Sequence, residues 1–242
     1  MPKHEKTGSK ILETIKALSM EKHEYGPARP REFPHLDLTF YDRSEHELDQ
    51  LGFRSLGDWE NLTVSGASTG VMRTFLRLAV SRDGLVTAAL YHARTRLVLC
   101  LLLSVLGKQP VFKVCEFESE YSDGSFLVTT NSKVASTLRI PPVMIVESKP
   151  HHTPIAALSL LHRQRMNAYA ILVPSIGPIT YHNAEDVLAS QNRQQAFRAA
   201  YRKQIRGISR EELADLSRGR DNLVNQIHDA VHRTNAQHTS AD

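Results

Sequence analysis

Three glutamates alternate along one predicted strand and are the first side chains in the sequence that could do chemistry. The segment "VFKVCEFESEY" (111–121) places Glu116, Glu118 and Glu120 two residues apart, so they share one face of a strand. Carboxylates in such a row can bind a cation or a basic partner, and a buried one can act as a general acid or base. The row predicts either a solvated acidic face or a polar site.

Two arginines on another predicted strand could join these glutamates. In "VMRTFLRLAVS" (71–81), Arg73 and Arg77 lie opposite an apolar face that includes Leu76 and Leu78. The enzyme alternative is a carboxylate–arginine pocket, hydrolase-like in character, made of Glu116, Glu118, Glu120, Arg73 and Arg77. Helices or loops over the glutamate face would favour this pocket, and water over that face would disfavour it.

A run of basic residues near the C-terminus predicts a different kind of site. Residues 190–210 contain Arg193, Arg198, Arg202, Lys203, Arg206 and Arg210 and no acidic residue. On a helix, Arg198, Arg202, Lys203 and Arg206 form a basic stripe beside Tyr201. Such a stripe could bind an acidic protein surface, a phosphate-bearing ligand or nucleic acid. The alternative is a solvated helix face that pairs with the glutamates of the sheet.

Metal and cofactor motifs are absent from the sequence. His151 and His152 precede a predicted helix that carries His162 about 13 Å further along its axis, so we expect a loop pair and a helix-surface histidine. The chain has no H-E-x-x-H, C-x-x-C, G-x-S-x-G, G-x-G-x-x-G or P-loop motif. We therefore expect neither a metal nor a cofactor.

The composition is that of a folded protein. The chain has 242 residues, 41% hydrophobic and 23% charged, with a formal net charge of +4. Its most apolar stretch, "LVLCLLLSVL" (97–106), has half of the roughly 20 residues that a membrane helix needs. We expect a buried core strand there, a buried helix being the alternative, and no membrane span. Cys100 and Cys115 lie in apolar runs and predict buried free thiols in the cytoplasm.

Strands and helices are segregated along the chain, which predicts an α+β fold with an antiparallel sheet of about five to seven strands over residues 35–148. We expect the C-terminal helices to pack against the apolar face of this sheet. Predicted strands are 35–42, 54–65, 71–81, 85–93, 96–106, 111–121 and 125–131; predicted helices are 9–22, 44–51, 153–174, 183–206 and one that a capping box of Ser209 and Glu212 begins. The domains are an N-terminal helix and proline arm (1–32), one α+β domain (33–234) and a tail (235–242).

The strongest hairpin signal is Ser122-Asp123-Gly124 between two strands. A two-residue loop at Asp123 and Gly124 would pair Tyr121 with Phe126. Phe126, Val128 and Thr130 would then lie on the apolar face with Phe117, away from the glutamates.

From these patterns we favour a binding or regulatory module that recognises an anionic partner through the basic stripe. The enzyme with the carboxylate–arginine pocket is one alternative. A homo-oligomeric assembly protein, dimerising through residues 9–22, is another.

Overall fold

The computed structural model describes residues 21–66, 72–94, 111–132, 139–205, 209 and 211–212. Several sequence predictions lie outside the described residues: the helix at 9–22 except for its last two positions, the strand at 96–106 with Cys100, and Arg206. Cys115 is described and is a buried free thiol.

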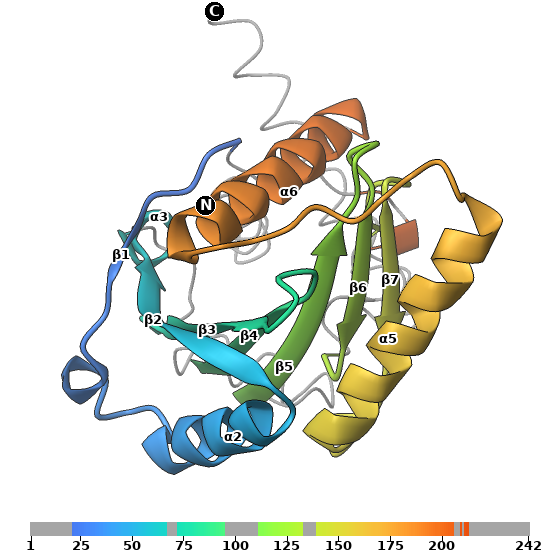
Figure 1. Ribbon diagram of the computed structural model, residues 1–242. Helices are drawn as coiled ribbons and strands as arrows, with labels where there is room; N and C mark the ends of the chain where they lie inside the picture. The colour runs from blue at the N-terminus through green and yellow to red at the C-terminus, as the bar shows by residue number, and fades with distance from the viewer. Residues whose placement is uncertain are drawn as a thin grey trace, which may run out of the picture.

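The described chain is α+β, built on one seven-stranded sheet whose strands follow in chain order (Figure 1). The strands are β1 Tyr25–Pro27, β2 Phe53–Asn61, β3 Phe75–Ser81, β4 Thr87–Arg94, β5 Val111–Glu120, β6 Phe126–Thr130 and β7 Met144–Ser148. All neighbouring pairs are antiparallel except β6 and β7, which are parallel. This confirms the predicted fold class and strand number.

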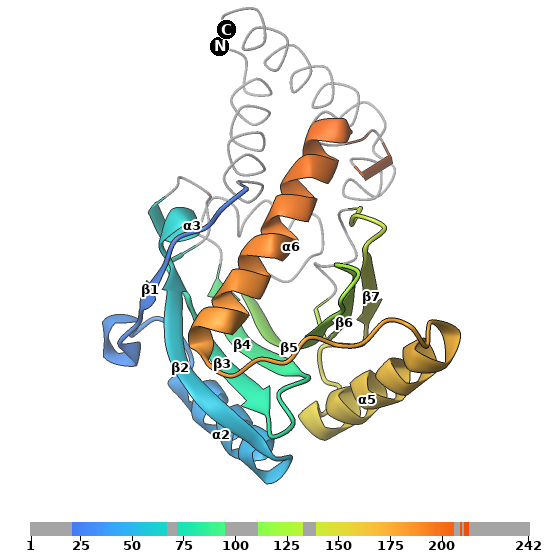
Figure 2. The same cartoon turned by 45° about the horizontal axis from the view of Figure 1, so that its top comes forward.

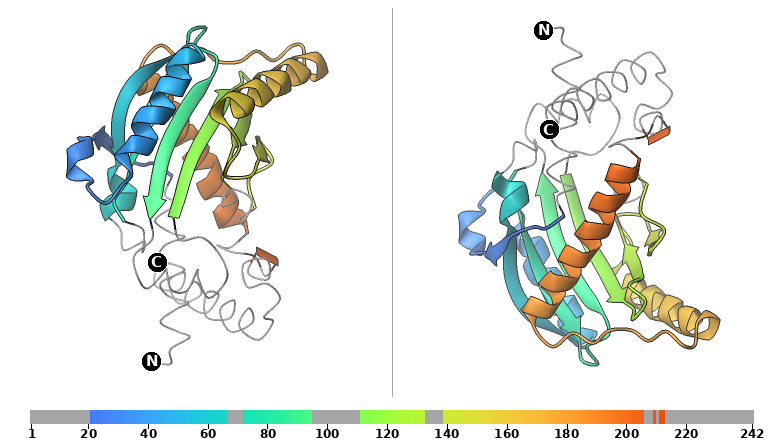
Figure 3. Two further views of the ribbon diagram at one scale, coloured as in Figure 1. Left: turned by 90° about the horizontal axis from the view of Figure 1, so that it is seen from below. Right: turned by 90° about the horizontal axis from the view of Figure 1, so that it is seen from above.

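Helices cover both faces of the sheet. The helix α2 (Leu38–Gln50) and the helix α5 (Ile155–Leu172) lie on one face, and the helix α6 (Ala184–Gln204) crosses the other face (Figure 3). A short 3-10 helix η1 (Pro30–Glu32) and the helix α3 (Leu62–Gly66) flank strands β1 and β2.

The main apolar core lies between the sheet and the pair α2 and α5. It contains Phe75, Leu90 and Phe117 from the sheet with Leu48 and Leu158 from the two helices. These five side chains are at most 1% exposed, so their burial is the main favourable term in forming this layer.

The predicted strand at 35–42 is wrong, because most of it belongs to α2. Asp37 is the N-cap, its side chain accepting a hydrogen bond from the backbone N–H of Phe40. Leu36 and Phe40 alternate as in a strand, but they are also four residues apart, which is helical spacing. The helix therefore begins before Ser44, which is buried within it, and ends before Gly52, whose φ of 84° suits the position after a helix.

The predicted hairpin exists, but its register is shifted by one residue. Phe126 pairs with Glu120 and not with Tyr121, and Val128 pairs with Glu118. The loop is three residues long, Ser122–Gly124, because the backbone N–H of Tyr121 bonds the carbonyl of Ser125. The shift moves Phe126, Val128 and Thr130 to the glutamate face, since a slip of one residue exchanges the faces of a strand.

The connection between α5 and α6 carries the chain from one face of the sheet to the other, as Figure 2 shows. It is tied to the strand ends, because the N–H of Tyr181 bonds the carbonyl of Gly84 at 2.8 Å and the N–H of Ile179 bonds that of Glu120 at 2.7 Å. We expected the C-terminal helices on the apolar face; α5 lies there, whereas α6 covers the face that carries the glutamates.

Candidate acid–base site

The sheet-facing side of α6 is polar where it crosses β5. Asn183 is the N-cap, as predicted, and accepts a hydrogen bond from the N–H of Asp186. Beyond the apolar Val187, polar side chains at helical spacing contact the sheet, namely Ser190, Gln191, Gln194 and Arg198. A polar helix stripe therefore packs beside the glutamate row of β5.

Glu118 on β5 is a buried acid under this stripe, with 3% of its surface exposed. Its Oε2 atom accepts hydrogen bonds from the side-chain amides of Gln191 at 2.5 Å and Gln194 at 2.8 Å. Among the described residues, none donates a hydrogen bond to its Oε1 atom, and no cationic side chain forms an ion pair with it. Glu118 is thus a buried carboxyl group held by neutral donors alone.

Glu116 completes a pair of carboxyl groups. It is half-buried, one step along the same strand face, opposite Ala89 on β4 and Thr130 on β6. Burial, followed by the charge of Glu116 and a hydrogen bond with it, raises the pKa of Glu118 well above its usual range. The environment of Glu118 therefore favours its protonated form, whereas Glu116 is only half-buried.

Glu120, the next glutamate on the face, has the opposite environment. It is also buried, but Arg193 binds both of its oxygens at 2.6 and 2.7 Å. Ser190 adds a hydrogen bond of 2.7 Å. Such a bidentate ion pair stabilises the charged carboxylate, so Glu120 anchors α6 to the sheet.

Two tyrosines lie close to the carboxyl pair. Burial, followed by the charge of Glu116, raises the pKa of Tyr91 on β4 well above its usual range; burial, followed by the charge of Glu118, raises that of Tyr25 on β1 to about 12. Both rings are only half-buried. Their hydroxyl groups stay protonated; that of Tyr25 hydrogen-bonds Asn61 and that of Tyr91 hydrogen-bonds Ser132.

The predicted basic stripe does not form one exposed surface. Arg202 is buried and pairs with Glu212 at 2.6 Å, because the N–H of Glu212 bonds Ser209 in the predicted capping box and holds this acid nearby. Lys203 is exposed and Tyr201 is half-buried. Arg198 turns toward the sheet, where it contacts Sδ of Met144 on β7 and its charge partly offsets the rise in the pKa of Glu118.

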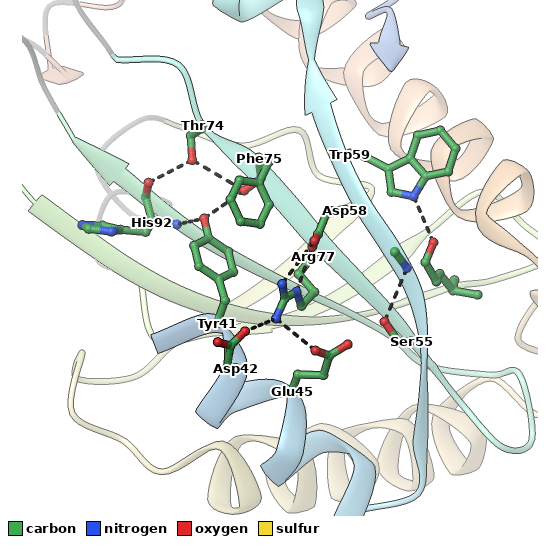
Figure 4. A network of polar contacts seen from close by, with 12 residues as sticks. Tyr41, Asp42, Glu45, Ser55, Asp58, Trp59, Thr74, Phe75, Arg77 and His92 are labelled. Atoms are coloured by element: carbon green, nitrogen blue, oxygen red, sulfur yellow. Dashed lines mark hydrogen bonds and ion pairs between the residues drawn. The ribbon is translucent and has the colours of Figure 1, made fainter. Parts of the chain in front are cut away.

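The structure does not bring Arg73 or Arg77 to the glutamates. Arg77 lies on the face that α2 covers, where it binds Asp58, Asp42 and Glu45 at 2.8–3.0 Å (Figure 4). Arg73 binds Glu60 at 2.6 Å near the sheet edge. The predicted carboxylate–arginine pocket is thus divided, because strand alternation puts Arg77 and Glu118 on opposite faces.

His162 is not on the helix surface, as the sequence had suggested, but fully buried between α5 and the sheet. Ser119 and Thr129 hydrogen-bond its two ring nitrogens at 3.1 and 3.0 Å. Burial lowers the pKa of His162 to about 3, so this histidine is a neutral core residue.

His151 and His152 are exposed. Over the described ranges, no three His, Cys, Asp or Glu side chains are grouped as a metal site.

Sequence reasoning missed Gln191, Gln194, Tyr25 and Tyr91. One signal was present: Val187, Gln191, Gln194 and Arg198 follow helical spacing, so a helix that buries Val187 also turns its glutamines inward. The tyrosines gave no such signal, because only the curved sheet brings β1 and β4 near the same carboxyl group.

Comparison of the chain with protein-family models, curated proteins and solved structures found no match. Within the part of the chain that is described, no helix combines the length and apolar composition needed to cross a membrane.

Proposed function

We propose that this chain is an enzyme that catalyses proton transfer on a small polar molecule, with Glu116 and Glu118 as the reacting pair. The observation that carries the proposal is Glu118, a buried carboxyl group that hydrogen-bonds the carboxyl group of Glu116 and forms no ion pair with a described cation. The helix α6 covers this part of the glutamate face, which is the condition that favoured the enzyme alternative.

The pair has the properties that acid–base chemistry requires. Two adjacent carboxyl groups in different environments divide into a proton donor and a proton acceptor. Glu118 donates its proton to one atom of the bound molecule, and Glu116 takes a proton from another atom. The pair then again holds one proton in total, and exchange with solvent through the half-buried Glu116 restores the starting state.

A purely structural role accounts for Glu120 better than for Glu118. A buried carboxyl group without a cation destabilises the fold in its ionised form, and Arg193 shows that α6 can supply a cation where one is needed. Residues that keep such an unfavourable environment are frequent at functional sites. Tyr25 and Tyr91 add hydroxyl donors beside the pair.

Recognition of a protein or nucleic acid by an exposed basic stripe has less support. Arg202, in the middle of the stripe, is buried and paired with Glu212.

We propose the cytoplasm as the compartment of this protein, because Cys115 is a buried free thiol. Dimerisation through residues 9–22 stays a prediction from the sequence.

The test is a search for activity with three variants. The wild-type protein is incubated in D2O with a defined mixture of purified primary metabolites, and chromatography with mass spectrometry follows loss, new products and deuterium uptake. We expect one component to change with the wild type and with the control Glu185→Gln, an exposed glutamate of α6. The rate should fall by about 10²-fold or more in Glu116→Gln and Glu118→Gln. No change with the wild type, or equal rates in all proteins, contradicts the proposal.

A further inference from the structure

Arg198 differs from the two other arginines of α6 that the structure describes. Arg193 pairs with Glu120 and Arg202 with Glu212. Arg198 forms no ion pair with a described carboxylate. Among the described residues, its guanidinium hydrogen-bonds Sδ of Met144 and Oε1 of Gln194, both at 3.5 Å, which is long for a nitrogen–oxygen hydrogen bond.

The position of Arg198 is set by several elements. Its contacts with Met144 on β7 and with Gln194, which bonds Glu118, place the guanidinium on the glutamate face. Its charge there partly offsets the burial that raises the pKa of Glu118, Tyr25 and Tyr91. The side chain is half-buried and faces the sheet, unlike the exposed Lys203. Its charge is therefore directed at the carboxyl pair and away from bulk solvent.

Gln194 connects the arginine to the acid. Its amide nitrogen donates to Glu118 at 2.8 Å, and its amide oxygen faces the guanidinium of Arg198. Because both hydrogen-bonding ends of one side chain are occupied in this way, the amide holds a fixed separation between the carboxyl group and the guanidinium.

We propose that Arg198 binds an anionic group, a carboxylate or a phosphate, on the small molecule that Glu116 and Glu118 act upon. A guanidinium offers a planar fork of donors that matches both kinds of anion and binds them through charge-assisted hydrogen bonds. A half-buried guanidinium that no described carboxylate pairs is available for this. The neutral form of Glu118 removes one negative charge that would repel such a ligand. The inference rests on the proposed function in that the ligand is the molecule on which Glu116 and Glu118 act. Binding of an anion by Arg198 does not depend on that reaction.

The experiment uses the full chain and two probes, sodium acetate and sodium phosphate, at constant ionic strength against sodium chloride. Binding is followed by NMR through the ring signals of Tyr25 and Tyr91 and by the melting temperature. We expect saturable binding with a Kd on the order of 1 mM. The Kd should rise about tenfold or more in Arg198→Gln and about threefold in Arg198→Lys, which keeps the charge but loses the fork. Lys203→Gln removes the same charge from an exposed position of α6 and should change the Kd by less than about twofold.

Each outcome decides between the proposals. Saturation by acetate assigns a carboxylate, and saturation by phosphate alone assigns a phosphate; either supports the inference. The inference is overturned if Arg198→Lys binds the probes as tightly as the wild type, or if Lys203→Gln loses as much affinity as Arg198→Gln. If Arg198→Gln does not fold, Arg198→Lys still provides the test. Glu118→Gln should still bind the probes. Probe binding without any metabolite turnover would therefore contradict the acid–base proposal alone, and turnover without probe binding would contradict this inference alone.

Discussion

Gln194 on α6 donates a 2.8 Å hydrogen bond from Nε2 to Oε2 of Glu118 on β5, across 76 positions of sequence. The contact joins the helix that crosses the glutamate face to a buried acid of that face. The protonation of Glu118 consequently depends on where α6 lies.

Replacing Gln194 with leucine should raise the pKa of Glu118 further. The hydrogen bond from Gln194 favours the charged carboxylate, and leucine cannot supply it. The pKa is measured from the ¹³C chemical shift of the Glu118 carboxyl carbon during a pH titration. The control is Gln204→Leu at an exposed position of α6, which should leave the titration unchanged. An unchanged titration in Gln194→Leu would show that the contact is absent in solution.

Glu118→Gln and Glu120→Gln should have opposite effects on stability. The pKa of Glu118 is raised in the folded state, so its ionisation removes stability as the pH rises above the unfolded-state value of about 4.3. Glu118→Gln should therefore gain stability relative to the wild type between pH 5 and pH 8. Glu120→Gln leaves Arg193 without its carboxylate and should lose about 1–3 kcal/mol at pH 7. Urea unfolding at pH 5, pH 7 and pH 8 measures the free energy of unfolding of each variant. A loss of stability in Glu118→Gln at pH 8 would favour a structural role for Glu118.

His162 should make the protein sensitive to mild acid. Its pKa is lowered to about 3 in the folded protein, against about 6.5 in the unfolded chain. The stability that neutral His162 contributes is therefore complete above pH 6.5 and is lost as the pH falls. The expected loss is roughly 2 kcal/mol between pH 7 and pH 5. His162→Asn should unfold more easily at pH 7 but lack this part of the pH dependence, whereas His152→Asn, at an exposed loop position, should keep it.

Gly84→Ala should destabilise the connection that leads to α6. Gly84 has a φ of 72°, and an added Cβ would lie 2.7 Å from Cγ2 of Thr180 and 2.8 Å from the carbonyl oxygen of Tyr181. We expect a loss of about 1–3 kcal/mol, measured by denaturant unfolding. Gly177→Ala is the control, because an added Cβ there meets no atom within 4 Å.

Arg77→Met tests the separation of the two sheet faces. The substitution leaves Asp58 without its cation and should reduce stability by on the order of 3 kcal/mol. Arg43→Met removes an exposed helix pair and should change stability by less than about 0.5 kcal/mol. Binding of acetate and phosphate by folded Arg77→Met should equal that of the wild type, because Arg77 lies on the α2 face. Loss of probe binding would place the anion site on that face.

Local signals predicted individual elements well. Asn183 begins α6, Ser209 and Glu212 form the capping box, and the glycine of the hairpin loop has a φ of 80°. The errors arose where two structures satisfy the same local pattern. Leu36 and Phe40 fit a strand and a helix, and the hairpin loop could have two or three residues. A choice between these requires the packing of the rest of the chain.

By itself the sequence determined the α+β class, the strand row of Glu116, Glu118 and Glu120, and the helix that bears Arg198, because these follow from periodicity and capping within a few residues. Only the tertiary structure decided that α6 lies on the glutamate face, that Arg193 binds Glu120, and that Glu118 is bound by two amides and by no described cation. Burial and pairing of a charge depend on side chains that are distant in sequence and meet only when helices and sheet pack together.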